Sequence, residues 1–175
     1  MTSASTTSVA VPAVGTYRID PERSEIRYRG RHMFGLGVVH ATFGATGEIR
    51  VADPLQSSSA TVAVDPASFS SSSPKRDADV RSSRLLDVKR YPEIRFVSDG
   101  LRQDGDRWLL PGRVTAHGTT VPVEVVIDRV TLDGQDVRAH GRAEHLDRRA
   151  FGVTGGRGFV GRYLDLVLDV VATPS

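Results

Sequence analysis

Few residues in this chain have the type and spacing that chemistry requires, and His32, Arg76 and Asp77 are the main candidates. His32 shares one face of an alternating segment with Tyr28 and Phe34, so we expect its side chain to lie at least partly inside the protein. The three residues could form the polar end of a binding site, or His32 could act as a general base oriented by Asp77. The alternative is structural: His32 would bond to the backbone in the core, and Asp77 would stabilise a helix N-terminus.

The sequence contains no recognisable motif for catalysis or for metal binding. None of the five histidines is spaced as H-x-H or H-x-x-x-H, and the chain has no cysteine, so we predict no metal and no cofactor. The G-x-S-x-G motif of serine hydrolases is absent. Residues 152–158, GVTGGRG, precede a strand-like pattern instead of a helix, so we interpret them as a loop at the rim of the fold. We therefore predict no catalytic residues and a protein that is not an enzyme.

Charge and composition limit the possible partners. The 23 basic residues are interleaved with 21 acidic ones along the whole chain, which predicts no nucleic-acid partner. No uninterrupted apolar stretch reaches the roughly 18 residues of a membrane-spanning helix. Residues 1–14 are small and polar and lack Lys and Arg, so we predict a disordered N-terminal tail, no signal peptide and a cytoplasmic protein.

Most of the remaining chain alternates between apolar and polar residues, as half-buried β-strands do. The alternating segments are residues 25–34, 39–43, 49–51, 60–64, 121–127 and 164–170. Asp104-Gly105 and Asp133-Gly134 separate alternating segments and predict hairpins with type I′ turns, and His117–Thr120 predicts a third turn. We expect roughly eight to ten strands in one domain over residues 15–175, folded as a sandwich or a closed barrel.

Residues 76–96, RDADVRSSRLLDVKRYPEIRF, combine a helical part with an extended part. We predict a helix over Arg76–Asp87. The Tyr91-Pro92 step ends it, because a residue before proline is disfavoured in the α conformation. Ile94 and Phe96 then follow at strand spacing.

This segment resembles the signature of the YceI-like family, the polyisoprenoid-binding, lipocalin-like proteins. Further blocks fit in the family's order, namely Tyr17–Pro21 with Ser24, His32, Val39 with Phe43, residues 114–123, and Arg148 or Arg149 with Phe151-Gly152. The resemblance covers Tyr17 to about Ala172. It implies an all-β fold: an extended antiparallel lipocalin-like β-barrel of about eight strands with one short α-helix.

The resemblance also implies a long apolar ligand inside the barrel, such as a polyprenyl chain or the tail of a quinone. Many inward positions carry small side chains, which leaves either a cavity or a flattened barrel that packs against itself. We predict the following ligand-binding residues: Tyr28, His32, Phe34, Ala41, Phe43, Val62, Arg76, Asp77, Leu85, Leu86, Phe96 and Phe151.

Three functions remain open at this point. The first is a carrier or store for an isoprenoid-type lipid, with the predicted helix gating entry. The second is an enzyme that acts on a lipid head group in the same pocket. The third is an interaction module with an empty barrel, whose Arg27, Arg29 and Arg31 would meet an acidic partner or an anionic membrane surface. The resemblance also leaves a homodimer as an open alternative.

Overall fold

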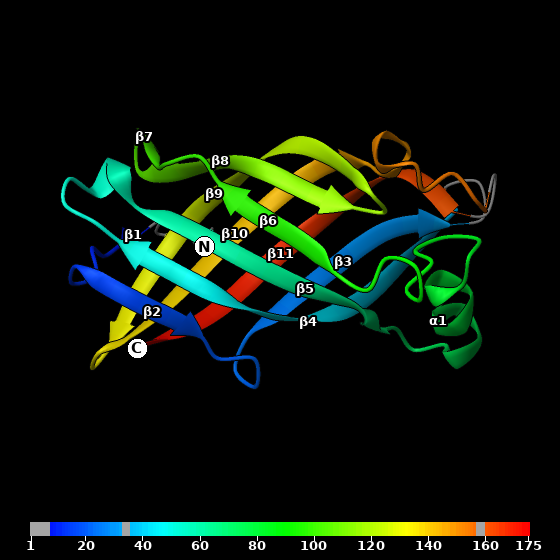
Figure 1. Ribbon diagram of the computed structural model, residues 1–175, viewed down its shortest axis with the longest axis horizontal. Coiled ribbons are helices and arrows are strands. Elements are labelled where there is room, and N and C mark those ends of the chain that lie inside the picture. Colours follow the sequence, from blue (N-terminus) through cyan, green and yellow to red (C-terminus); the bar gives the residue numbers. More distant parts are fainter. Residues whose placement is uncertain (1–7, 33–35, 157–159) are drawn as a thin grey trace, which may run out of the picture.

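The structure, a computed structural model, describes residues 8–32, 36–156 and 160–175, and strands dominate it (Figure 1). In chain order the elements are β1 (Ser8–Val9), β2 (Gly15–Ile19), β3 (Glu25–His32), β4 (Gly37–Val51), the 3₁₀ helix η1 (Leu55–Ser57), β5 (Ser59–Ser70), α1 (Pro74–Arg81), β6 (Ile94–Ser98), β7 (Arg102–Asp104), β8 (Arg107–Ala116), β9 (Thr119–Asp133), β10 (Asp136–Asp147), the 3₁₀ helix η2 (Arg148–Phe151) and β11 (Val160–Pro174).

Within the described residues the strands form one sheet that closes on itself. Its hydrogen-bonded circuit runs through β9, β10, β11, β4, β5, β6 and β8 and returns to β9, and β2 and β3 share the place between β11 and β4. These eight positions are all antiparallel, and such closure removes open sheet edges. The prediction of an antiparallel barrel of about eight strands with one α-helix is confirmed.

β4 shows how the alternation of the sequence specifies the barrel wall. Every second residue of this strand points inward, and the buried members are Val39, Ala41, Phe43, Ala45 and Val51. The residues between them are mostly polar and exposed, because successive side chains of a strand point to opposite faces. The predicted segments 39–43 and 49–51 are therefore parts of one long strand.

The three predicted turns exist, but two of them differ in type from the prediction. In the β7–β8 and β9–β10 hairpins only the glycine of the turn has positive φ, 59° at Gly105 and 61° at Gly134. Each aspartate stays in its strand and glycine takes the first central position, which type II′ turns favour. The type I′ pattern occurs instead between β8 and β9, where His117 and Gly118 have φ of 52° and 77°.

The helix α1 is shorter and begins earlier than predicted. Ser73 caps α1, accepting a hydrogen bond from the backbone N–H of Arg76 at 3.3 Å. The helix ends at Arg81 because both the backbone N–H and the hydroxyl of Ser82 donate to the Asp79 carbonyl. Leu85 and Leu86 therefore lie in the turns that follow the helix, and the prediction of a helix over Arg76–Asp87 is wrong at both boundaries.

The two ends of the barrel carry different closing elements (Figure 1). The α1 end holds α1, η2 and residues 152–156, and the β7 end holds β1, η1 and β7. β1 pairs in parallel with β9, and the Tyr17 hydroxyl donates to the Ala13 carbonyl at 2.6 Å. Residues 8–14 thus lie against the barrel, which corrects the prediction of a disordered tail for that part of residues 1–14. Residues 1–7 lie outside the described residues.

Candidate functional site

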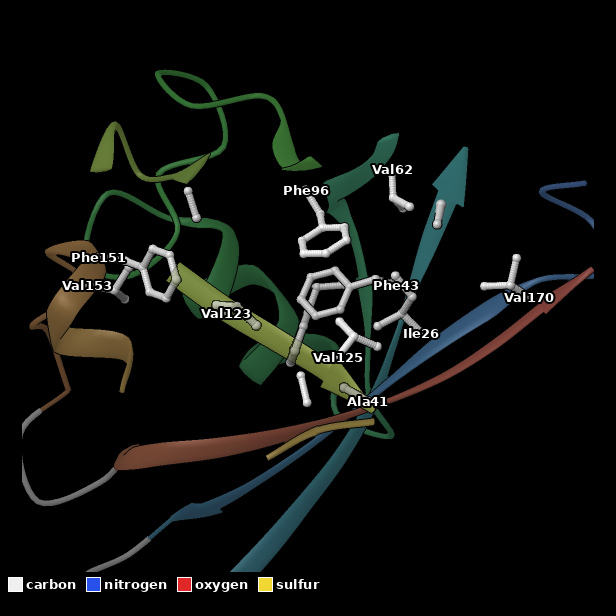
Figure 2. Packing of buried hydrophobic residues seen from close by; sticks show 14 of the residues in the cluster. Ile26, Ala41, Phe43, Val62, Phe96, Val123, Val125, Phe151, Val153 and Val170 are labelled. Carbon is white, nitrogen blue, oxygen red and sulfur yellow. The ribbon is translucent and has the colours of Figure 1, made fainter. Parts of the chain in front are cut away.

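The interior of the barrel contains a cavity of about 260 Å³ toward the α1 end. Nearly every strand of the barrel contributes to its wall, and the side chains that face it are mostly Val, Ile, Leu and Phe. Figure 2 shows Phe43, Phe96 and Phe151 pointing into the same interior from three parts of the chain. Such a lining excludes water and favours an apolar guest.

Tyr28 supplies one of the few polar groups on this wall. Its ring packs edge-on against Phe69, with centroids 5.7 Å apart, and lies across Gly30, where an added Cβ would collide with the tyrosine hydroxyl. Among the described residues the hydroxyl has no hydrogen-bond partner. Burial raises the pKa of Tyr28, whereas the positive charges of Arg148 and Arg76 act in the opposite direction. The hydroxyl is therefore protonated at neutral pH and can donate a hydrogen bond.

Arg148 supplies the second polar group, and it carries a charge. The side chain is 5% exposed, at the start of η2, and it lines the cavity. Its guanidinium donates to three backbone carbonyls: Nε to Gly161 at 2.8 Å, Nη1 to Val153 at 2.7 Å and Nη2 to Val160 at 3.0 Å. Arg148 therefore links η2 to Val153, Val160 and Gly161 at the rim of the cavity.

The charge of Arg148 lies in an unfavourable environment for a cation. Burial lowers the pKa of its guanidinium, and the positive charge of Arg149 acts in the same direction. Arginine nevertheless stays protonated in proteins, so the rim carries a permanent positive charge. This residue was missing from the predicted site. The R-x-x-F-G block pointed to it, but the sequence left open whether Arg148 or Arg149 filled the first position.

Arg76 and Asp77, which we predicted to be at the polar end, have different surroundings. Both carboxylate oxygens of Asp77 accept hydrogen bonds from Ser71, so Asp77 is buried as part of the connection between β5 and α1. Arg76 is half-buried and does not line the cavity. Its guanidinium has no ion pair or hydrogen bond with another described residue, although its charge acts on Tyr28.

The other predicted residues divide into three groups. The cavity is lined by seven of the predicted residues: Tyr28, Phe43, Val62, Leu85, Leu86, Phe96 and Phe151. Ala41 is buried in the core cluster but does not reach the cavity. The side chain of His32 and all of Phe34 lie outside the described part of the structure. A role in ligand binding stays a prediction for the whole set.

A second apolar cavity of about 120 Å³ lies toward the β7 end. Its lining includes Val9, Pro12 and Trp108. The two cavities adjoin, because they share five lining residues: Ile49, Ala60, Leu110, Ile127 and Ala139. A guest longer than the first cavity would therefore meet these side chains before it reached the second cavity.

Metal ligation and membrane spanning both find no support among the described residues. No group of three or more His, Asp or Glu side chains there is placed to hold a metal ion. No helix in that part of the chain is both long and apolar enough to cross a membrane.

A family model described as the YceI-like domain matches residues 17–172, so the chain belongs to the YceI-like family. A UPF0312 protein of Pseudomonas putida (strain GB-1) is 29% identical over 166 residues, which cover 88% of this chain and 84% of that relative. Protein YceI of Salmonella arizonae is 26% identical over 174 residues, covering 94% of this chain and 89% of its own.

Solved structures have the same fold. BcnA of Burkholderia cenocepacia superimposes with a TM-score of 0.80 at 23% identity, covering 89% of this chain and 99% of its own. A polyisoprenoid binding domain from Saccharophagus degradans, implicated in plant cell wall breakdown, gives a TM-score of 0.67 at 11% identity. That match covers 93% of this chain and 100% of the domain.

Proposed function

We propose that this protein binds and carries a lipid with a long isoprenoid-type tail, such as a polyprenyl chain or the tail of a quinone, inside its barrel. The observation that carries the proposal is the apolar cavity of about 260 Å³. The similarity in fold to a polyisoprenoid binding domain supports the same class of ligand.

The energetics of the cavity favour a tail over a polar ligand. Each methylene group moved from water into the barrel contributes about 0.8 kcal/mol, so a few isoprene units outweigh a single polar contact. An unfilled cavity of about 260 Å³ forgoes packing energy on the order of 6 kcal/mol. A tail that fills it recovers part of this energy, and affinity should follow the length and shape of the tail.

No observation favours the two alternative functions to the same degree. An enzyme that uses Asp77 to orient His32 would need a free carboxylate, and both oxygens of Asp77 accept hydrogen bonds from Ser71. An interaction module that uses the outer arginines of β3 would need free guanidinium groups, and Arg27 pairs with Asp169 at 3.3 Å.

A matched pair of substitutions tests the proposal. Val62 lines the cavity from β5, whereas Val97 on β6 is 39% exposed. Val62→Trp should fill much of the cavity and lower the affinity for farnesol or geranylgeraniol by at least about tenfold, with circular dichroism showing an intact barrel. Val97→Trp should leave the affinity unchanged. Equal affinity in a folded Val62→Trp protein would remove the internal cavity as the binding site.

A further inference from the structure

Arg148 is a buried cation without a carboxylate partner. Moving an ionised group out of water is costly unless a group of opposite charge compensates it. All 21 Asp and Glu residues of the chain lie within the described residues, and none of them forms an ion pair with Arg148. The neighbouring Asp147 is already bound by Arg162, whose Nη2 lies 3.0 Å from Asp147 Oδ2.

The hydrogen bonds of Arg148 leave part of its donor capacity unused. A guanidinium has five N–H groups, and three of them donate to the carbonyls of Val153, Val160 and Gly161. The described residues accept none of the other two. Arg148 lines the cavity, so a group at this end of the cavity can reach it.

Tyr28 adds a further hydrogen-bond donor to this cavity, and Arg76 adds a second positive charge that acts on it. Tyr28 lines the same cavity, and its hydroxyl is a protonated donor without a described acceptor. Tyr28 and Arg148 both line this cavity, and the positive charges of Arg148 and Arg76 both act on the Tyr28 hydroxyl. Donors and positive charge that converge without an acceptor are the complement of an anion.

We propose that Arg148 and Tyr28 bind an oxyanion head group, a phosphate or a carboxylate, on the lipid whose tail fills the cavity. This inference rests on the proposed function and adds the chemical class of the head group. The two unused N–H groups of Arg148 suit the paired oxygens of a phosphate or carboxylate. The tail supplies most of the affinity, and the head group fixes the orientation of the ligand with its polar end toward η2.

Ligands with one tail and different head groups test the inference. We would measure the affinity of the protein for farnesol, farnesyl monophosphate and farnesoic acid by titration calorimetry, with inorganic phosphate as a separate ligand. At least one of the two anions should bind about tenfold more tightly than farnesol. Inorganic phosphate alone should not compete at the concentrations at which farnesyl monophosphate saturates the protein.

Substitutions assign that preference to a residue. Within the Arg148→Met protein itself, the ratio of anion affinity to farnesol affinity should fall to less than about twofold, whatever the loss of rim contacts does to the affinity for both ligands. If Arg148→Met does not fold, Arg148→Lys takes its place in the experiment. Lysine keeps the positive charge but lacks the paired N–H donors of the guanidinium, so this variant should retain only part of the preference for the anions. Arg149→Met, a change of the exposed neighbour, should retain the full preference.

The outcomes distinguish this inference from the function on which it rests. Equal affinity of the wild-type protein for farnesol and both anions would overturn the oxyanion site and leave the apolar cavity in place. Binding of none of the farnesyl ligands would overturn both. A full anion preference in folded Arg148→Met would overturn the assignment to Arg148. Competition by inorganic phosphate at similar concentrations would overturn the claim that the tail supplies most of the affinity.

Discussion

The α1 end and the β7 end of the barrel are built from the same alternating strands, yet their interior polar groups differ. At the β7 end the Tyr17 hydroxyl donates to the Ala13 carbonyl, and the Ser58 hydroxyl accepts from the Ala52 N–H. At the α1 end Arg148 and Tyr28 face the cavity with donors that no described residue uses. This difference is the basis for the proposed orientation of the ligand, with its apolar tail along the barrel and its polar head at the α1 end.

The largest expected effect comes from a larger side chain at the boundary that the two cavities share. Ala60 lines both of them, so Ala60→Phe should exclude long tails from the β7 end. If about four methylene groups of the tail stay in water instead of the barrel, the binding free energy weakens by roughly 3 kcal/mol, which is about 100-fold in affinity. Binding of geranylgeraniol should therefore weaken far more than binding of geraniol, as measured by titration calorimetry.

The control for this change lies on the same strand. Ala63 belongs to the outward face of β5, since Val62 and Val64 are the residues beside it that line the cavity. Ala63→Phe should bind both prenols as the wild type does. Equal losses for the long and the short prenol in Ala60→Phe would show that the two cavities do not act as one channel.

Two arginines at the α1 end should differ in their contribution to stability. Arg148→Met leaves the carbonyls of residues 153, 160 and 161 without their donor, which should cost on the order of 2–4 kcal/mol in the free energy of unfolding. Arg162→Met breaks a solvent-accessible ion pair with Asp147 and a contact with the Tyr163 ring, and should cost less than about 1 kcal/mol. Urea denaturation measures both, and equal losses would contradict the assignment of Arg148 as the residue that holds the rim.

The smallest expected effect concerns the ionisation of Asp147. Hydrogen bonding to Arg162 holds the pKa of this carboxyl below its usual range. The pair therefore contributes stability above the pKa of Asp147 in the unfolded chain, and this contribution is lost as the pH falls through the lower pKa of the folded protein. Arg162→Gln should raise the pKa of Asp147 in a carboxyl NMR titration.

Asp20 is the matched control for that titration, because hydrogen bonding to Arg23 lowers its pKa on a different part of the surface. Its pKa should not change in Arg162→Gln. A pKa of Asp147 that also stays constant would show that Arg162 is not the group that stabilises its ionised form.

The barrel wall could be predicted from the sequence because strand alternation is a local property. Ile26, Phe43, Val123 and Val125 all lie inside as their period of two requires. The helix boundary was harder to predict, because the end of α1 depends on whether Ser82 bonds to the Asp79 carbonyl or leaves the helix to continue.

The polar end of the cavity could be predicted only in part, because it depends on long-range packing. Asp77 has the right type for a ligand contact, but the turn at Ser71 takes both of its oxygens. In the sequence Arg148 follows a long strand, and an arginine at such a position is expected to be exposed. Its burial depends on η2 and on the return of the chain along β11, and no local pattern encodes that arrangement.

The most direct test of the account uses Trp108, the single tryptophan of the chain, which lines the cavity at the β7 end. A long-chain carboxylic acid brominated at the far end of its tail should quench the fluorescence of Trp108 on binding. The same acid brominated beside its carboxylate should quench much less, because the head group lies at the α1 end with Arg148. Stronger quenching by the bromine beside the carboxylate, or equal quenching by both, would contradict the proposed orientation of the ligand in the barrel.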